Sequence, residues 1–223
     1  MAVFALQNEL IFPPVGMAEP DGLLAIGGDL SPERLLLAYR SGIFPWYEGK
    51  TPMWWCPDPR FVLYPEKLKV SKSMQQLIRR NALHFSINRD FPAVIRSCKT
   101  SFRPGQDGTW ITDAVEKAYI DLHSAGYAHS AEAWLNDKLV GGLYGIKMGN
   151  MFFGESMFSS VSNASKYAFI LYVQQLMEKG IRLIDCQVYT PHLESLGAEM
   201  IPRELFIRQM NTLLQEEAGP GPV

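Results

Sequence analysis

Three strand-like segments follow one another at short intervals in the second half of the chain, and their order limits the folds it can adopt. The segments are AHSAEAWLN (128–136), KLVGGLYGIKMG (138–149) and MFFGESMF (151–158). The pairs Asn136-Asp137 and Gly149-Asn150 join them, and residues of these types suit two-residue hairpin turns. The spacing therefore predicts an antiparallel meander of three strands.

A long, mostly apolar segment follows the meander. Its composition predicts a buried helix from Ala164 to Lys179 that ends at Gly180, because glycine readily adopts the left-handed conformation found at helix ends. RLIDCQV, residues 182–188, is predicted to form another strand. A meander, a buried helix and a further strand together predict an α+β fold built in layers.

The strand RLIDCQV contains two polar residues, Asp185 and Gln187, in an otherwise apolar setting. Side chains alternate along a strand, so these two are expected to share one face. A buried carboxylate is costly unless it is paired or hydrogen-bonded, so the sequence predicts a partner for Asp185. The residues alone leave two interpretations open: the pair holds a neighbouring loop, or it belongs to a functional site.

The N-terminal residues differ from the rest because they are rich in Pro, Gly and Trp. Only SPERLLLAYRSG has a clear helical pattern there, with Ser31 as N-cap, Pro32 in the first turn and Gly42 at the end. We therefore expect a small Trp/Pro/Gly-rich N-terminal domain, residues 1–65, followed by a larger domain, residues 66–223. Further helices are predicted at residues 71–81, near 91–100 and at 112–126.

Composition limits the classes of protein to which the chain can belong. It has 223 residues, of which 47% are hydrophobic and 20% charged, ordinary values for a globular protein. With 21 basic and 23 acidic residues the formal charge is −2, which does not indicate a surface that coats nucleic acid. The three cysteines and four histidines lack the spacing of a disulfide framework or a structural zinc site, so no metal is expected.

The chain also lacks signals for export or membrane insertion. Its N-terminal residues have no basic start followed by a small-residue cleavage site. The longest fully apolar run, Tyr167 to Val173, is too short to span a bilayer. These features predict a soluble, cytoplasmic protein without a membrane partner.

The order of the elements resembles the acyltransferase fold of the GCN5-related acetyltransferase superfamily, so we expect a domain of that kind after the N-terminal one. The resemblance implies that an acyl donor and an amine acceptor meet at a splayed sheet. Members that use acetyl-CoA bind its pyrophosphate with a Gly-rich turn at a helix N-terminus. FSSVSNASK stands at that position here and contains no G-x-G, so a donor other than CoA, and no cofactor, is expected.

Six motifs make the resemblance more specific. They are DGLLAIGGDLSPERLLLAYRSGIFPWY, WWCPDPR, GTWIT, GESMFS, NASK, and LIDCQV followed by HLESLGA. In this order they resemble the leucyl/phenylalanyl-tRNA–protein transferase family. The resemblance implies a bacterial enzyme that moves Leu or Phe, and less well Met, from aminoacyl-tRNA to the α-amine of proteins beginning with Arg or Lys. It also implies that the product enters the N-end rule degradation pathway and that neither ATP nor metal is needed.

The resemblance places Asp185 and Gln187 in the reaction centre. An aminoacyl ester is already activated, so the enzyme has to position the ester and the amine, remove a proton and stabilise an oxyanion. Because a neutral amide has negligible basicity, we expect Gln187 to orient the reacting groups by hydrogen bonding. We expect Asp185 to act electrostatically.

Three further residues match positions that hold the 3′-terminal adenosine of the tRNA in the family. Glu155, in MFFGESMF, is expected to accept hydrogen bonds from the ribose or the adenine, and a structural salt bridge is its alternative role. Trp46 and Trp110 are expected to stack on the adenine. The other tryptophans are expected to fill the core: Trp54, Trp55 and Trp134.

The resemblance also implies an apolar pocket for the Leu or Phe side chain. The positions that match it are Leu143, Phe152, Met157, Phe169, Tyr172 and Ile184. Residues of these types equally suit an ordinary core. Tyr172 carries a hydroxyl group where the family more often has Phe, a difference that bears on side-chain preference.

A basic segment, KLKVSKSMQQLIRR, matches the family's contacts with the body of the tRNA. The residues expected to contact phosphates are Lys67, Lys69, Lys72, Arg79 and Arg80. A solvated helix face is the alternative, because scattered surface Lys and Arg are common. Gln75 and Gln76 stand where the family commonly has basic residues, a difference that bears on tRNA affinity and not on the reaction.

Two functions from other classes stay open. A CoA-dependent N-acetyltransferase would bind CoA, and a module that only binds the aminoacyl end of tRNA would leave the ester intact. The partners that the resemblance implies are Leu-tRNA, Phe-tRNA and proteins with N-terminal Arg or Lys, and we expect the enzyme to be a monomer.

Overall fold

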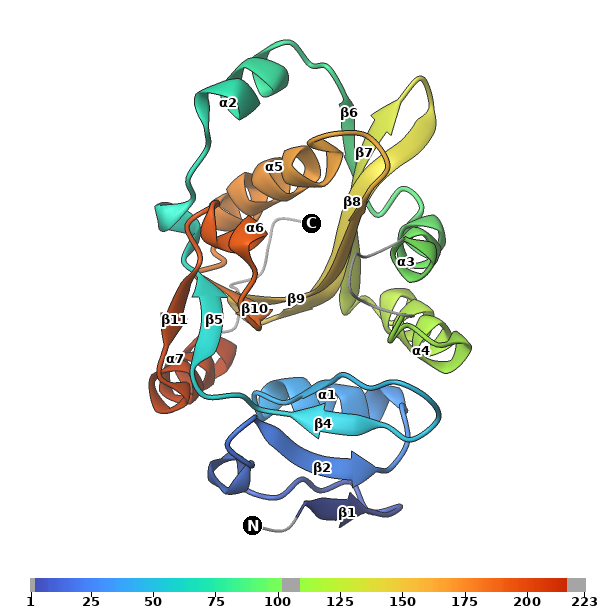
Figure 1. Ribbon diagram of the computed structural model, residues 1–223, viewed down its shortest axis with the longest axis vertical. Coiled ribbons are helices and arrows are strands. Elements are labelled where there is room, and N and C mark those ends of the chain that lie inside the picture. Colours follow the sequence, from blue (N-terminus) through green and yellow to red (C-terminus); the bar gives the residue numbers. More distant parts are fainter. Residues whose placement is uncertain (1–2, 102–108, 216–223) are drawn as a thin grey trace.

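A seven-stranded sheet forms the centre of the larger part of the molecule (Figure 1). The computed structural model describes residues 3–101 and 109–215, and within them the strand order is β11-β5-β10-β9-β8-β7-β6. The strands are β5 (Arg60–Leu63), β6 (His84–Ile87), β7 (Ala128–Leu135), β8 (Lys138–Met148), β9 (Met151–Ser159), β10 (Leu183–Gln187) and β11 (Glu199–Ile201). Neighbouring strands are antiparallel except β9 and β10, which run parallel.

The predicted meander is confirmed as β7, β8 and β9. Asn136 and Asp137 have φ angles of 49° and 57°, the left-handed conformation that a two-residue hairpin turn requires. The connection from β9 to the parallel strand β10 contains α5 (Ala164–Glu178), because parallel neighbours need a crossover. Gly180, with φ of 84°, lies just beyond the end of α5, as predicted.

The N-terminal residues form a separate four-stranded sheet, in the order β1-β2-β4-β3. Its strands are β1 (Phe4–Leu6), β2 (Leu23–Gly27), β3 (Phe44–Pro45) and β4 (Met53–Trp55), and a 3₁₀ turn, η1 (Val15–Met17), precedes β2. The predicted helix is α1 (Pro32–Arg40), and the Ser31 hydroxyl caps it by accepting a hydrogen bond from the backbone N–H of Arg34. We call residues 3–58 the N-terminal unit, which lies at one end of the molecule (Figure 1).

The chain enters the larger sheet before residue 65. β5 begins at Arg60 and pairs with β10 and β11. β5 is therefore the part of residues 1–65 that belongs to the larger sheet. The domain boundary at residue 65 stays a prediction.

Helices cover both faces of the larger sheet. In addition to α5 they are α2 (Lys72–Arg79), α3 (Phe91–Thr100), α4 (Asp113–Ser124), α6 (Pro191–Glu194) and α7 (Arg203–Gln215), with a 3₁₀ turn, η2 (Pro65–Lys67). α5 packs on one face of the meander, and α3 and α4 pack on the other (Figure 1). The three helices predicted at residues 71–81, 91–100 and 112–126 are confirmed as α2, α3 and α4.

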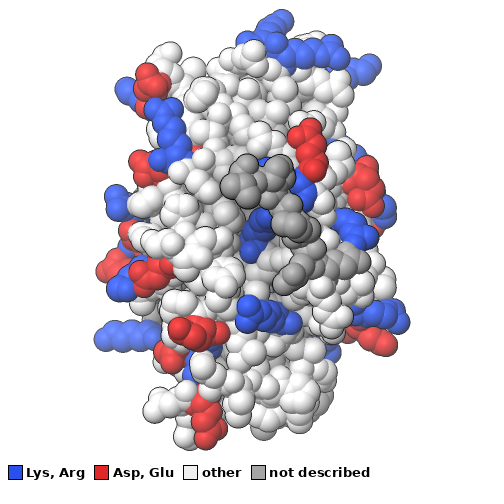
Figure 2. All heavy atoms as spheres, turned by 180° about the vertical axis from the view of Figure 1, so that it is seen from behind, with Lys and Arg blue, Asp and Glu red and all other residues white. Residues whose placement is uncertain are grey.

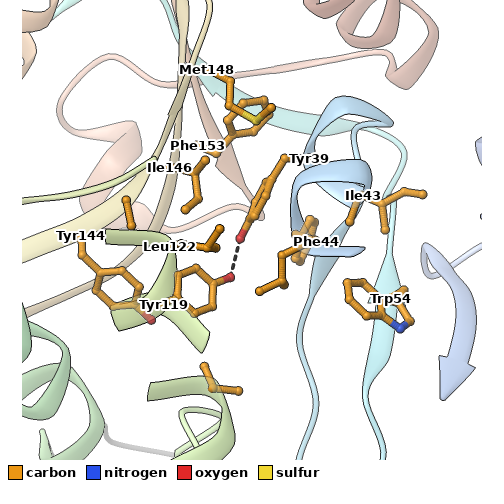
Figure 3. Packing of buried hydrophobic residues seen from close by; sticks show 14 of the residues in the cluster. Tyr39, Ile43, Phe44, Trp54, Tyr119, Leu122, Tyr144, Ile146, Met148 and Phe153 are labelled. Carbon is orange, nitrogen blue, oxygen red and sulfur yellow. Dashed lines mark hydrogen bonds between the residues drawn. The ribbon is translucent and has the colours of Figure 1, made fainter. Parts of the chain in front are cut away.

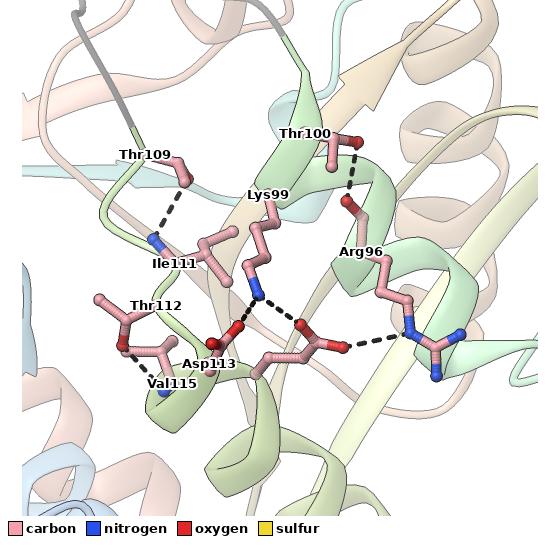
Figure 4. A network of polar contacts seen from close by, with 9 residues as sticks. Arg96, Lys99, Thr100, Thr109, Ile111, Thr112, Asp113 and Val115 are labelled. Carbon is pink, nitrogen blue, oxygen red and sulfur yellow. Dashed lines mark hydrogen bonds and ion pairs between the residues drawn. The ribbon is translucent and has the colours of Figure 1, made fainter.

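Polar contacts join α3 to α4 (Figure 4). The Lys99 ammonium group donates to Asp113 and, at 2.8 Å, to Glu116, which also accepts from Arg96 at 3.1 Å. Thr112 caps α4, since its hydroxyl accepts a hydrogen bond from the backbone N–H of Val115 at 3.2 Å. These contacts hold the beginning of α4 against α3.

Two apolar cores lie on the two faces of the larger sheet. One fills the space between the sheet and α5. The other is shared by the N-terminal unit, α3, α4, α7 and the facing side of the sheet, and includes Tyr39, Phe44, Tyr119 and Phe153 (Figure 3). Burial of one such large side chain contributes about 1.5–3 kcal/mol. The N-terminal unit is therefore held in place by a core that it shares with the larger sheet.

Candidate active site

β9 and β10 pair briefly and then stop pairing. The paired residues are Met151 with Leu183, Phe152 with Ile184, and Phe153 with Asp185. β9 continues to Ser159, so its second half pairs with β8 and not with β10. Glu155 and Gln187 lie just beyond the last pair, one on each of the two strands.

Both strands contain an irregularity at this level. The register between β8 and β9 skips Glu155, which is therefore the extra residue of a bulge. The register between β10 and β5 shifts between Asp185 and Gln187. A bulge bends its strand and redirects a side chain, and such features are common beside active sites. The polar side chains therefore converge where the two strands part.

Asp185 forms a buried ion pair with Arg60 of β5. The Arg60 Nε and Nη2 atoms donate to Oδ1 and Oδ2 of Asp185 at 2.8 and 2.6 Å. The guanidinium group lies between the rings of Phe44 and Phe206, with its carbon 4.7 and 4.5 Å from their centroids. A bidentate pair of this kind offsets much of the cost of burying both charges. The prediction that Asp185 has a partner is confirmed.

Gln187 is held by two hydrogen bonds. Its backbone N–H donates to Oδ1 of Asp185 at 2.9 Å, and its φ of 63° is uncommon for a residue other than glycine. Its side-chain Nε2 donates to Oε1 of Glu155 at 2.7 Å. The amide nitrogen is thereby committed to Glu155, which leaves the amide oxygen of Gln187 as the group that can accept a hydrogen bond from a substrate.

Glu155 receives three hydrogen bonds and forms no salt bridge with the described residues, so the structural salt bridge considered as its alternative is not found there. Its carboxylate accepts from the hydroxyl groups of Tyr39, at 2.7 Å, and Tyr119, at 2.9 Å, as well as from Gln187. Burial raises the pKa of Glu155 to about 8, although these three hydrogen bonds oppose the rise and the charge of Asp185 adds to it. A carboxylate has about four acceptor positions, so one stays available to a ligand.

The five tryptophans differ in exposure. Trp46 is 41% exposed and packs against Trp55 with ring centroids 5.7 Å apart. Trp110 is only 7% exposed and packs edge to face with Tyr119, with ring centroids 6.4 Å apart. Trp54 and Trp134 are buried, as predicted for core residues, whereas Trp55 on β4 is only half-buried and so differs from the prediction. Trp46 therefore has the ring surface that a base could most readily stack on.

The residues predicted to form the aminoacyl pocket lie together. They are Leu143, Phe152, Phe169, Tyr172 and Ile184, with Met157 packed against them, all in the core between α5 and the sheet. Phe152 and Tyr172 meet edge to face, with centroids 5.2 Å apart, and burial raises the pKa of Tyr172 well above its usual value. The group borders the place where β9 and β10 part, because Phe152 and Ile184 are paired one step before it.

The basic residues predicted to contact the tRNA body lie on and before α2. Lys67 pairs with Glu199 at 2.6 Å, so its charge is already balanced. Lys69, Lys72, Arg79 and Arg80 are exposed and form no ion pair with any residue of the described ranges. Figure 2 shows Lys and Arg gathered at the end of the molecule where α2 lies in Figure 1, away from the N-terminal unit.

Sequence reasoning missed three residues of the site: Arg60, Tyr39 and Tyr119. The sequence indicated that Asp185 needs a partner, but Arg60 lies 125 positions away and no local pattern connects the two. Arg60 stands at the start of the apolar run FVL, and a lone basic residue at the start of a buried strand was the available signal. Neither tyrosine carries a sequence signal, because each occupies an ordinary buried position of its helix.

Two further observations concern classes of site. No helix of residues 3–101 or 109–215 is long and apolar enough to cross a membrane. In the same residues no group of three or more His, Cys, Asp or Glu is arranged to hold a metal ion.

Relatives with similar sequences share one description. A protein of Syntrophus aciditrophicus (strain SB), 54% identical over 92% of this chain and 87% of its own length, is a leucyl/phenylalanyl-tRNA–protein transferase. A protein of Anaeromyxobacter sp. (strain Fw109-5), which is 53% identical over 99% of this chain and 94% of its own length, has the same description. So does a protein of Pseudomonas fluorescens (strain Pf0-1), which is 54% identical over 92% of each chain.

Two solved structures are much less similar to this chain. A conserved protein of unknown function from Bacteroides thetaiotaomicron has a TM-score of 0.43 and 16% identity, covering 71% of this chain and 55% of its own. L-PGS from Bacillus licheniformis has a TM-score of 0.42 and 14% identity, covering 77% and 57%.

Family-level comparison covers most of the chain. Residues 62–211 match the family described as leucyl/phenylalanyl-tRNA protein transferase, and residues 28–58 match the N-terminal domain of the same family. The match agrees with the resemblance carried by the six sequence motifs and with the high identity of the relatives over nearly their full length. The chain therefore belongs to the leucyl/phenylalanyl-tRNA–protein transferase family and is an aminoacyltransferase.

Proposed function

We propose that the enzyme transfers Leu or Phe, and less well Met, from aminoacyl-tRNA to the N-terminal α-amine of proteins that begin with Arg or Lys. The product enters the N-end rule degradation pathway, and the reaction takes place in the cytoplasm on a monomeric enzyme without ATP. The observation that carries this proposal is the fixed orientation of Gln187. Its amide nitrogen is bound to Glu155, so its amide oxygen is the acceptor offered to an incoming amine.

The chemistry requires positioning more than activation. The amine nitrogen attacks the ester carbonyl carbon, a C–N bond forms, and the C–O bond to the ribose breaks. The Gln187 oxygen accepts a hydrogen bond from the amine and so aligns the nitrogen lone pair with the carbonyl carbon. The proton that the amine loses balances the one that the ribose oxygen gains on leaving. Asp185 supports this arrangement by holding the backbone N–H of Gln187.

Substrate recognition divides among three sets of residues. Trp46 and Trp110 stack on the terminal adenine, and Glu155 accepts a hydrogen bond from the adenosine with its remaining acceptor position. The six pocket residues between α5 and the sheet receive the Leu or Phe side chain. The basic residues around α2 contact tRNA phosphates, because exposed cations without ion pairs release counterions on binding nucleic acid.

The parting of β9 and β10 also supports a finer fold assignment. Strands that pair and then separate give a donor and an acceptor access to the same backbone position, as the splayed sheet of a GCN5-related acetyltransferase-like domain does. We assign residues from β5 onward to such a domain and residues before β5 to the small N-terminal domain, since β5 hydrogen-bonds within the larger sheet.

The transfer reaction itself tests the proposal. Phe-tRNA is supplied without ATP, metal or CoA, together with a peptide that begins with Arg or a control peptide that begins with Asp. We expect Phe on the Arg peptide and essentially none on the control. Gln187→Ala is expected to reduce transfer by about 10²-fold or more, the scale of a positioned catalytic group, while Gln209→Ala on α7 serves as the matched control.

The other outcomes identify the competing functions. A requirement for acetyl-CoA would indicate an N-acetyltransferase. Tight binding of Phe-tRNA with the ester left intact would indicate a binding module. Equal labelling of the two peptides would contradict the preference for basic N-termini.

A further inference from the structure

Two buried tyrosines from different parts of the chain meet at the carboxylate of Glu155. Tyr39 belongs to α1 of the N-terminal unit, and Tyr119 belongs to α4. Their hydroxyl groups point towards each other and are hydrogen-bonded (Figure 3). Tyr39 also bonds to Oε1 of Glu155 and Tyr119 to Oε2, at 2.7 and 2.9 Å. The three side chains therefore form a closed triangle of contacts.

The same carboxylate holds the amide of Gln187. Oε1 of Glu155 accepts from Nε2 of Gln187 at 2.7 Å and from Tyr39, so one oxygen atom joins the tyrosine pair to the amide. Each hydroxyl contact restricts the rotation of the carboxylate, and the carboxylate in turn restricts the rotation of the amide. An amide that turned over would present its nitrogen, and not its oxygen, to an incoming amine.

We propose that Tyr39 and Tyr119 are positioning residues for aminoacyl transfer, because their hydroxyl groups hold the Glu155 carboxylate in the orientation that directs the Gln187 amide towards the acceptor amine. The inference rests on the proposed function of Gln187. It also gives the N-terminal unit a part in the reaction, because α1 supplies one of the two hydroxyl groups.

The triangle titrates as a unit. Three oxygen-to-oxygen contacts need three protons, and the two phenols supply two. When Glu155 is protonated, its carboxyl group supplies the third proton, and each of the three contacts is a hydrogen bond. When Glu155 is ionised, both tyrosines can donate to its carboxylate, but the contact between the two tyrosines then has no proton. The ionised carboxylate binds the Gln187 N–H more strongly, since hydrogen bonds to charged groups are the stronger ones.

Other charged and titratable groups surround the triangle. Asp185 of β10 favours the protonated form of Glu155, and Arg60 of β5, paired with Asp185, favours the ionised form. Tyr144 of β8 packs edge to face on Tyr119 with centroids 5.4 Å apart. Tyr39→Phe and Tyr119→Phe leave all of these residues in place, so each variant tests the effect of one hydroxyl group on Glu155.

The experiment removes each hydroxyl group alone. Tyr39→Phe and Tyr119→Phe are compared with Tyr167→Phe, which deletes a buried hydroxyl that donates to the Leu83 carbonyl oxygen at 2.8 Å on the other face of the sheet. Single-turnover transfer from Phe-tRNA to an Arg peptide is measured between pH 6 and 9.5. Because the two hydroxyls stabilise the ionised carboxylate, the pH at which transfer reaches half its maximum should rise by about one unit in Tyr39→Phe and Tyr119→Phe.

The expected loss is largest at neutral pH. At pH 7 each of the two variants should be about tenfold or more slower than the wild type, and the difference should narrow at high pH. Titration of the acceptor amine adds its own pH dependence, but that is the same for every variant. Tyr167→Phe should keep the wild-type profile. In a Glu155→Gln background, Tyr39→Phe should have little further effect.

Two results would overturn the inference. One is a Tyr39→Phe or Tyr119→Phe profile that coincides with that of Tyr167→Phe, and the other is a uniform loss at every pH that persists in the Glu155→Gln background. Each of these two results counts against the inference only if the wild-type enzyme transfers Phe and the Gln187→Ala variant does not. Wild-type protein without transfer, or an active Gln187→Ala variant, would instead count against the proposed function.

Discussion

The ion pair between Asp185 and Arg60 is the most buried charge interaction of the site. Both side chains are excluded from solvent, and the aromatic rings of Phe44 and Phe206 cover the guanidinium group. Asp185 bonds to the backbone of Gln187, so its ionised state also supports the unusual backbone conformation there. The pair therefore connects β5 to the residue that we propose to align the amine.

Removing one member of this pair should destabilise the protein strongly. Asp185→Leu and Arg60→Met each leave a buried charge without a partner, so each should lower the free energy of unfolding by about 3–5 kcal/mol. The double variant should lose much less than the sum, because no unpaired charge is left. Urea denaturation of the four proteins measures this, and additive losses would contradict the assignment of the pair.

Glu155 should give stability a characteristic pH dependence. Its pKa rises from 4.5 in the unfolded chain to about 8 in the folded protein, so the folded state binds the proton more tightly. The resulting stabilisation is complete below pH 4.5 and is lost as the pH rises towards 8. Glu155→Gln cannot titrate, so the difference in unfolding free energy between wild type and variant should change across this range. Denaturation at pH 5, 6.5 and 8.5 measures it, and a constant difference would show that Glu155 is not shifted upward.

At the scale of the element, the bulge in β9 determines where Glu155 points. Gly145 lies opposite the bulge in β8, where a Cβ atom would come within 2.1 Å of the Phe153 carbonyl oxygen. That oxygen belongs to the backbone and cannot move aside without breaking the pairing of β8 with β9. Glycine is therefore required at this position, as is common at bulges.

Gly145→Ala should therefore separate β8 from β9 at the bulge and displace Glu155. We expect a lower unfolding temperature together with a loss of transfer activity, because the same distortion affects both. Gly16→Ala is the matched control, since a Cβ atom there would meet nothing within 4 Å. Thermal denaturation and transfer assays measure the two effects, and a Gly145→Ala protein with wild-type activity would show that the bulge does not position Glu155.

At the scale of the whole molecule, the two proposed tRNA contacts lie far apart. Trp46, the exposed tryptophan, belongs to the N-terminal unit at one end of the molecule, and the basic residues of α2 lie at the other end (Figure 1). The proposed reaction centre lies between them, where β9 and β10 part. A ligand consisting of the terminal nucleoside alone can reach the first contact and not the second.

Charge reversal on α2 should therefore weaken tRNA and spare a small analogue. Arg79→Glu with Arg80→Glu is expected to weaken full-length Phe-tRNA and to flatten the dependence of its affinity on salt, because fewer counterions are released. Binding of the aminoacyl-adenosine analogue puromycin should be unchanged. Arg208→Glu, an exposed position on α7, is the control. Filter binding at several salt concentrations measures this, and equal losses for both ligands would refute the division into two contacts.

Much of the fold could be predicted from local pattern. The meander, α5, β10 and the helices α1 to α4 follow from residue periodicity, turn residues and caps such as Ser31 and Thr112, whose effects reach only a few positions along the chain. The need of Asp185 for a partner was also predictable, because the cost of burying a charge does not depend on the fold. The sequence motifs alone were enough to indicate the family.

Only the tertiary structure decided which distant groups meet. It inserted β5 between β10 and β11 and thereby selected Arg60 as the partner of Asp185. It also brought Tyr39 and Tyr119, 80 positions apart, to the carboxylate of Glu155. Local preferences act over a few residues along a helix or strand. Contacts between residues as distant in sequence as these depend on how the helices pack against the sheets. The sequence alone thus determined the elements and the demand for partners, and packing determined the partners.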